Sequence, residues 1–210
     1  MLLIILSVIF LRPFICALAF PYLNFVYSLT LLVLLGVYLI YKKPSFTKIQ
    51  LLVHPLVLFY LALCVSVIFS QNTANSLAQL YQYISGLCLF LMAVSLSEKD
   101  KILTVQTFIL AGLIISFLAI YQYFFGFKHL LDYLSTNNLT APFVLDYLQR
   151  KRAFFPFVTP GALGGYLAMI TLLTLTNKNR IWLLMFIFPA FLLTKSFGAF
   201  LSLFCALIIY

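Results

Sequence analysis

Residues 107–124, TFILAGLIISFLAIYQYF, decide the fold class of this chain. The stretch is apolar on every face of a helix, and its length approaches the roughly 20 residues that an α-helix needs to cross a bilayer. Residues 31–41, LLVLLGVYLIY, have the same character. A transmembrane β-barrel would instead show alternating segments of about ten residues. The sequence therefore predicts an all-α, polytopic transmembrane helical bundle.

The composition supports this class, because 65% of the residues are hydrophobic and only 8% are charged, too few to cover a water-facing surface. We expect one transmembrane domain over residues 1–210 with about eight crossings. Arg12 and Pro13 interrupt the first crossing, which should be short, tilted or re-entrant. The predicted crossings are residues 1–14, 22–41, 51–69, 77–96, 102–125, 157–176, 181–194 and 197–210.

Basic residues in the short loops predict the orientation, since Lys and Arg are enriched in cytoplasmic loops. Alternation of the predicted crossings places three basic loops on one side, which we assign to the cytoplasm. The segment 126–155 then lies on the outer face. The net charge of +9 is explained largely by charges beside the crossings and gives no reason to expect nucleic-acid binding. The loop cations are Lys42, Lys43 and Lys48, then Lys99 and Lys101, then Lys178 and Arg180.

The outer segment 126–155 contains two stretches with apolar residues at helical spacing, FKHLLDYL and PFVLDYLQRK. Pro142 is placed like a proline in the first turn of a helix. Both stretches are expected to form short helices along the membrane surface. His129, Asp132 and Asp146 are the titratable side chains there that could act in catalysis, although simple solvation of the helices is the better interpretation.

Arg150, Lys151 and Arg152 end this outer segment, on the side where Lys and Arg are usually scarce. They could anchor the chain to lipid phosphates, or they could bind an anion, for which guanidinium groups are well suited. Lys195 interrupts a later apolar stretch, where a mid-bilayer charge costs roughly 2.5–3.5 kcal/mol. We therefore expect Lys195 to mark a helix break at the outer surface or to line a polar cavity, and an ordinary interfacial turn explains this residue equally well.

Small residues follow both the Arg150–Arg152 stretch and Lys195 in the sequence. Gly161 with Gly165, and Gly198 with Ser202, have the spacing of closely packed membrane helices, and packing is the better interpretation of both pairs. No metal site is expected, because the cysteines lie in apolar runs without metal-ligand spacing, and no nucleotide-binding motif is present. The cysteines are Cys16, Cys64, Cys88 and Cys205.

Three elements in order resemble the O-antigen ligase and polymerase family of bacterial envelope membrane proteins. They are Tyr121-Gln122-Tyr123 with Gly126, then RAFFPFVTPGALGGYLAM, then LLTKSFGAFLSL, and the likeness covers roughly residues 50–210. The chain departs from the family at Phe155, Gly161 and Phe197, the last of which stands where the family has a second Arg. Lys195 could replace that Arg if the helix is broken there. The matching positions are Arg152, Phe157, Pro160, Gly165 and Tyr166, then Thr194, Ser196, Gly198 and Ala199.

The resemblance implies a multi-pass protein of the bacterial cytoplasmic (inner) membrane. It implies transfer of a saccharide from an undecaprenyl-diphosphate-linked donor to lipid A-core or a growing glycan at the outer face, without a metal or other cofactor. Arg152 and Lys195 would bind the donor diphosphate, and Arg150, Lys151, Ser196 and His129 could support them. The catalytic base is not assigned.

Two other functions remain open on the sequence. A transporter or flippase of lipid-linked saccharide would also place cations along a cavity, although its expected internal repeat is missing from the sequence. A non-catalytic membrane scaffold would need no cation pair. Because the chain stops inside an apolar run and family members continue, we expect it to hold only the donor-side half, so activity of the chain alone is not assumed.

Overall fold

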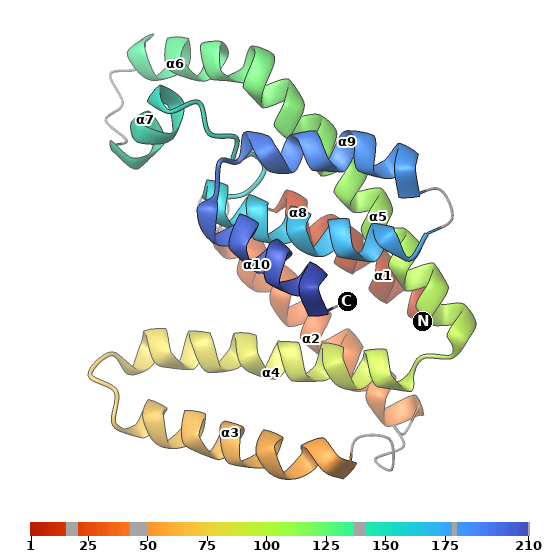
Figure 1. Ribbon diagram of the computed structural model, residues 1–210. Helices are drawn as coiled ribbons and strands as arrows, with labels where there is room; N and C mark the ends of the chain where they lie inside the picture. The colour runs from red at the N-terminus through yellow and green to blue at the C-terminus, as the bar shows by residue number, and fades with distance from the viewer. Residues whose placement is uncertain (16–20, 43–49, 137–141, 178–179, 210) are drawn as a thin grey trace. The chain divides into compact units, whose positions relative to one another are not determined.

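The computed structural model describes residues 1–15, 21–42, 50–136, 142–177 and 180–209 (Figure 1). These residues form helices and connecting turns without a β-strand, which confirms the predicted all-α structure for them. Cys16, Lys43, Lys48 and Lys178 lie outside the described residues. A 3-10 turn, η1 (Arg12–Phe14), follows the first helix, and a π-helical turn, η3 (Gln122–Gly126), follows the fifth. The α-helices are α1 (Leu2–Leu11), α2 (Pro21–Lys42), α3 (Gln50–Ile68), α4 (Thr73–Ser95), α5 (Glu98–Tyr121), α6 (Phe127–Thr136), α7 (Pro142–Gln149), α8 (Pro160–Leu175), α9 (Arg180–Leu193) and α10 (Phe197–Ile209).

Three of the described helical runs are long and apolar enough to cross a bilayer by length and composition, namely Phe25–Lys42, Asn75–Ser95 and Glu98–Leu134. The other apolar helices are shorter, and α10, for example, has 13 residues where a perpendicular crossing needs roughly 20. Membrane-spanning helices are therefore supported at three places, and the eight predicted crossings stay a prediction.

Polar side chains at the helix starts explain several boundaries. Asn72 Oδ1 accepts a hydrogen bond from the backbone nitrogen of Asn75 at 3.2 Å and so caps α4. Thr159 Oγ1 accepts one from the nitrogen of Ala162 at 3.1 Å, and Pro160 takes the first helical position of α8. Pro13 lies in the 3-10 turn that ends α1, since a proline removes a helical hydrogen bond.

The chain divides into two compact units, the first of which comprises Met1–Leu6 and Phe25–Ile102. Its α3 and α4 form an antiparallel helical hairpin, as Figure 1 shows. The hydroxyl group of Tyr60 on α3 donates a hydrogen bond to the backbone oxygen of Tyr83 on α4 at 2.8 Å. The ring of Phe59 also meets that of Tyr83 edge to face, with 5.8 Å between centroids. Aromatic contacts therefore join the two helices.

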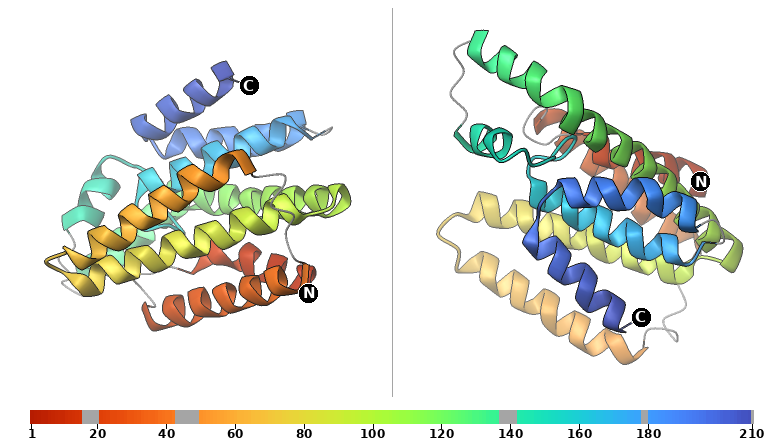
Figure 2. Two further views of the ribbon diagram at one scale, coloured as in Figure 1. Left: turned by 90° about the horizontal axis from the view of Figure 1, so that it is seen from below. Right: turned by 45° about the horizontal axis from the view of Figure 1, so that its top comes forward.

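The second unit comprises Ser7–Asn24 and Leu103–Tyr210 and is built around α8. Both views in Figure 2 show α8 beside α9 and α10, its main packing partners. Gly112 on α5 allows a close approach to α8, because a Cβ atom there would lie 2.5 Å from Ile170 Cγ2. The buried core of this unit consists of Ile115, Ala119, Ala153, Leu163, Leu167, Ala168, Ile170, Ile187, Ala190, Phe191, Ala199 and Leu203.

The helix predicted to end at Phe125 does not end there. It continues from α5 through η3 directly into α6, as the green ribbon in Figure 1 shows. Nothing in the FGFKHLL stretch stops it, since no proline removes a helical donor and a single glycine is tolerated. The predicted helices of the outer segment do occur, as α6 and α7, and α7 begins at Pro142 as expected. Their position along the membrane surface stays a prediction.

Candidate functional site

Residues 150–153 and 193–195 lie side by side in the second unit, although about 40 positions separate them in the sequence. The backbone nitrogen of Ala153 donates to the oxygen of Leu193 at 3.0 Å. Arg152 Nε donates to the oxygen of Thr194 at 3.3 Å, and Lys195 Nζ donates to the oxygen of Arg150 at 3.0 Å. We call Arg150, Lys151, Arg152 and Lys195 the cation cluster.

Arg152 follows the end of α7 and makes three contacts that fix its position. Its backbone nitrogen donates to the oxygen of Tyr147 at 2.9 Å, and its guanidinium carbon lies 5.8 Å from the centre of the Tyr147 ring. That distance allows a cation–π interaction. A guanidinium group has five N–H donors, and the hydrogen bond to Thr194 uses the one on Nε. The two terminal NH₂ groups therefore keep the fork geometry that suits phosphate oxygens.

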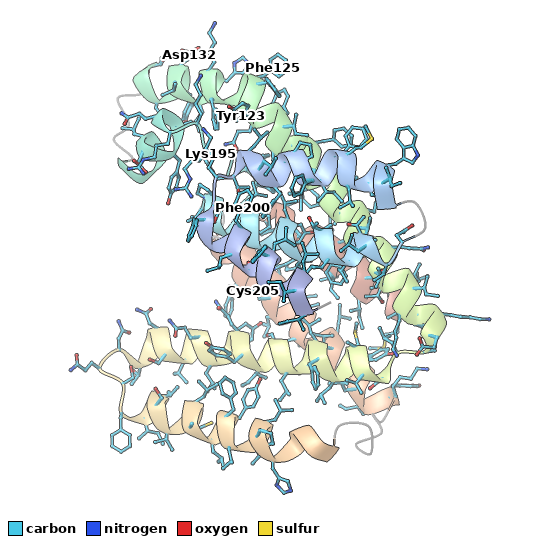
Figure 3. All side chains as sticks on the ribbon, in the orientation of Figure 1. Tyr123, Phe125, Asp132, Lys195, Phe200 and Cys205 are labelled. Carbon is cyan, nitrogen blue, oxygen red and sulfur yellow. The ribbon has the colours of Figure 1, made fainter. Side chains whose placement is uncertain are left out.

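Lys195 stands in the break between α9 and α10, as Figure 3 shows. The last turn of α9 closes through hydrogen bonds from the nitrogens of Thr194 and Lys195 to the oxygens of Phe191 and Leu192. Lys195 then takes a left-handed backbone conformation with φ of 48°, which turns the chain away from the axis of α9. The helix break predicted at Lys195 is confirmed.

The other two cations differ in their surroundings. Arg150 Nε lies 2.8 Å from Asp146 Oδ1, one helical turn earlier, and both side chains are substantially exposed. Such an ion pair contributes little stability, but it lowers the net charge that Arg150 offers to a ligand. Lys151 is exposed, and its backbone has a left-handed conformation like that of Lys195, with φ of 46°. The charge of the cluster is thus carried mainly by Lys151, Arg152 and Lys195.

Gln122 holds the chain segment that directly follows Arg150–Ala153. Its side chain is 6% exposed, and its Oε1 accepts hydrogen bonds from the nitrogens of Phe154 and Phe155 at 2.9 and 3.0 Å. Both donors directly follow the Arg150–Ala153 segment in the chain. The sequence resemblance included Gln122 without a role for it. The only feature of the sequence that pointed to Gln122 as a supporting residue was its polar side chain near the end of an apolar stretch.

The close packing predicted from the glycines occurs, but at a different glycine. A Cβ atom at Gly164 would lie 2.9 Å from Ala199 Cβ, 3.0 Å from Thr194 Oγ1 and 3.1 Å from Ser196 Cβ. A Cβ atom at Gly165 or Gly198 would meet nothing within 4 Å, and one at Gly161 would have only ordinary contacts. The predicted close packing is therefore wrong for Gly165 and Gly198, and the structure neither requires nor contradicts it at Gly161. Helix rotation turns Gly164 toward α10 and Gly165 away from it.

Ser196 and His129, the two predicted supporting residues outside the cluster, have different positions. Ser196 is 6% exposed and precedes α10, facing Gly164 beside the cluster. His129 is exposed on α6, and its side chain makes no hydrogen bond or ion pair within the described residues. The same helix carries Asp132 (Figure 3). The structure therefore places Ser196 at the cluster and gives His129 no described contact with it.

The apolar side of α6 packs on α7 rather than remaining free. Phe127 and Leu134 on α6 are buried together with Leu148 on α7, and Phe154 packs against them. Lys128, His129 and Asp132 lie on the exposed side of α6. An apolar stripe on α6 is consequently explained by contact between the two helices, whether or not a membrane surface lies nearby.

Among the described residues, no three His, Cys, Asp or Glu side chains gather in a way that could hold a metal ion. Comparison with protein-family models, curated proteins and solved structures finds no match to this chain. The geometry of the cation cluster and the sequence resemblance are thus the observations from which a function is inferred.

Proposed function

We propose that this protein is a membrane glycan ligase- or polymerase-like transferase with about eight crossings of the bacterial cytoplasmic membrane. It would transfer a saccharide from an undecaprenyl-diphosphate-linked donor to lipid A-core or a growing glycan at the outer face. The observation that carries the proposal is the pairing of residues 150–153 with 193–195, because the segments that carry Arg152 and Lys195 lie side by side.

The proposed chemistry requires positive charge at the leaving group. In the transfer, the bond between the anomeric carbon of the donor sugar and the diphosphate oxygen breaks, and an acceptor hydroxyl oxygen bonds to that carbon. The electron pair stays on the diphosphate, whose negative charge increases. Fixed cations that meet this charge stabilise the transition state. The acceptor proton passes to a base, which is not assigned among the residues of this chain.

The cation cluster suits this role because its members are positioned before a ligand arrives. Arg152 is fixed by Tyr147 and Thr194, and Lys195 is fixed by the oxygen of Arg150. Fixed donors lose less conformational entropy on binding than free side chains do. The ammonium group of Lys195 has three donors, so the hydrogen bond to Arg150 leaves capacity for a phosphate oxygen.

The helix break also supports the proposal. On a continuous helix, positions 195 and 197 would point about 200° apart, so Lys195 could not take the place of an Arg expected at Phe197. The chain between α9 and α10 is not helical, and this restriction is removed. Lys195 as the second diphosphate ligand remains part of the proposal.

The test compares variants of the full-length protein in membranes that contain a lipid-diphosphate-linked saccharide and an acceptor glycan. Arg152→Ala and Lys195→Ala should each lower the transfer rate, by roughly 10²-fold for Arg152, the size found when one transition-state donor is removed. Arg152→Lys should restore only part of the rate, because the bidentate fork is lost. Lys128→Ala, which removes an exposed cation on α6, is the matched control and should transfer normally.

Two results would count against the proposal. A transfer rate of Arg152→Ala equal to that of the wild type would show that Arg152 does not form a diphosphate site. Absence of transfer by the wild type, combined with Arg152-dependent movement of the lipid-linked saccharide across the membrane, would assign the cluster to a transporter instead. Expression and membrane insertion are measured for every variant, so that misfolding is recognised.

A further inference from the structure

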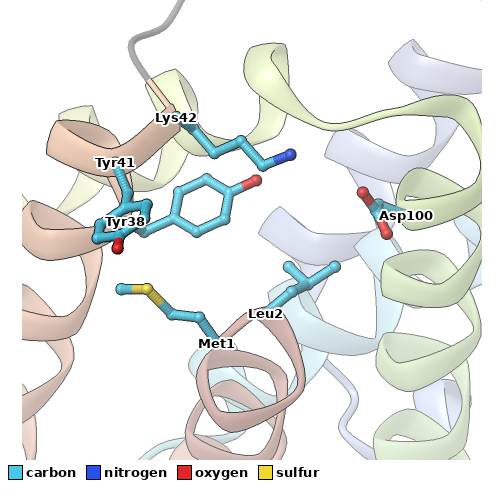
Figure 4. Close-up of a pocket in the computed structure, with 6 residues that line it drawn as sticks. All are labelled: Met1, Leu2, Tyr38, Tyr41, Lys42 and Asp100. Atoms are coloured by element: carbon cyan, nitrogen blue, oxygen red, sulfur yellow. The ribbon is translucent and has the colours of Figure 1, made fainter.

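A pocket in the first unit carries a second inference, which does not rest on the proposed glycan transfer. Its volume is about 500 Å³, within the range typical of small-molecule sites. It lies between the start of α1, the last turn of α2 and the first turn of α5 (Figure 4). The residues that line it are Met1, Leu2, Tyr38, Tyr41, Lys42 and Asp100.

Opposite charges face this pocket from different helices. Figure 4 shows Lys42 reaching in from α2 and Asp100 from α5 on the other side. Asp100 Oδ2 accepts a hydrogen bond from Ser97 Oγ at 2.8 Å, and a carboxylate has about four acceptor positions. The pocket thus offers a cation and a carboxylate to one ligand.

The remaining lining residues combine polar and apolar groups. Tyr38 is only 4% exposed and brings its phenol into the pocket (Figure 4). Met1 and Leu2 supply apolar surface. Tyr41, which lines the pocket, is 84% exposed, and its neighbour Ile40 on α2 is 76% exposed. Tyr and Lys at the end of an apolar helix are typical of a membrane interface, and this end is the predicted cytoplasmic one.

We propose that this pocket binds a phosphoethanolamine group, carried by phosphatidylethanolamine of the surrounding membrane. The phosphate would accept hydrogen bonds from Lys42 Nζ and the Tyr38 hydroxyl group, and the ammonium group would donate to the Asp100 carboxylate. A zwitterion matches the two opposite charges, whereas an anionic headgroup would meet Asp100 unfavourably. The acyl chains would lie along the exposed apolar side of α2 near Ile40.

The test measures lipid binding to the purified full chain by native mass spectrometry and by thermal shift in nanodiscs. The lipids are dioleoyl phosphatidylethanolamine, dioleoyl phosphatidylcholine and dioleoyl phosphatidylglycerol. Phosphatidylethanolamine should bind most tightly, because a quaternary ammonium has no N–H to donate and a glycerol headgroup has no cation. Lys42→Gln and Asp100→Asn should each weaken its binding by about tenfold, as expected for one charge-assisted hydrogen bond in a partly exposed site.

Matched controls lie on the same helix as Asp100. Lys99→Gln and Glu98→Gln change exposed charges that do not line the pocket, and both variants should bind like the wild type. Equal binding of the three lipids, or unchanged binding by Lys42→Gln and Asp100→Asn, would overturn the proposal. Protection by soluble phosphoethanolamine at the lipid concentration would support the site and assign it to a soluble source of the same group.

Discussion

Gln122 Oε1 lies 2.9 Å from the backbone nitrogen of Phe154, 32 positions later in the chain. Together with the hydrogen bond from Phe155, this contact fixes the segment that follows Arg152 onto the π-helical turn η3. The amide of one buried side chain thereby replaces the regular backbone partners that this irregular segment lacks.

The first prediction concerns this contact. Gln122→Leu should leave two partly buried N–H groups without an acceptor, and each such group costs about 1–3 kcal/mol. We expect the free energy of unfolding, measured by denaturant titration in detergent micelles, to fall by at least about 2 kcal/mol. Gln106→Leu, at an exposed position of α5, should change it little. Equal stability of the two variants would show that Gln122 is dispensable.

The second prediction uses two adjacent glycines as a matched pair. Gly164→Ala should force apart α8 and the 194–199 segment, because its Cβ atom would lie 2.9 Å from Ala199 Cβ. Overpacking of this kind costs typically 1–3 kcal/mol. Gly165→Ala meets nothing within 4 Å and should be neutral or slightly stabilising, since Ala favours a helix. Thermal unfolding of both variants measures the difference, and the reverse order would contradict the packing of α8.

The third prediction concerns topology. Reporter fusions after residues 43, 101 and 178 should read cytoplasmic, and a fusion after residue 137 should read outside. The run Glu98–Leu134 has 37 residues and is about 55 Å long, which exceeds a hydrocarbon core of about 30 Å. A cytoplasmic reading at residue 137 would mean that Arg150–Arg152 simply follow the orientation rule, and the outer-face site would be lost.

Much of the secondary structure could be predicted from the sequence, because helices in such a chain follow its apolar runs. The stretch predicted at 22–41 is Pro21–Lys42 in the structure, and that predicted at 181–194 is Arg180–Leu193. The continuation of α5 into α6 could not be predicted by the same reasoning. Hydropathy falls at Lys128 and His129, but a fall in hydropathy does not end a helix when its hydrogen bonds continue.

The candidate site was predictable only in part. Arg152 and Lys195 stood out because charge is costly in or near apolar stretches, and the structure brings their segments together. Gln122 and Gly164 were not identified as supports, because their roles depend on which side of a helix faces a neighbour. The G-x-x-x-G spacing drew attention to Gly165, whose added Cβ would be free of contacts. Spacing alone could not give the rotation of α8.

The fourth prediction concerns the left-handed backbone at Lys151, whose φ is 46°. A non-glycine residue pays roughly 1–2 kcal/mol for this conformation, and glycine pays much less. Lys151→Gly should therefore raise the free energy of unfolding by up to about 1 kcal/mol, after its greater freedom in the unfolded chain is deducted. Lys151→Ala keeps the unfavourable conformation and removes the same charge. A stability of Lys151→Gly no greater than that of Lys151→Ala would contradict this account.

Lys195 has the same left-handed backbone conformation as Lys151. At both positions of the cation cluster the backbone favours a residue other than lysine, whereas the positive charge requires lysine. A laboratory selection for heat resistance alone should enrich glycine or asparagine at both, and the survivors would lose two of the cations that face a ligand. Thermostabilised versions of this protein should therefore be screened for binding as well as for yield, because the most robust variants are expected to be the ones with the weakest hold on an anion.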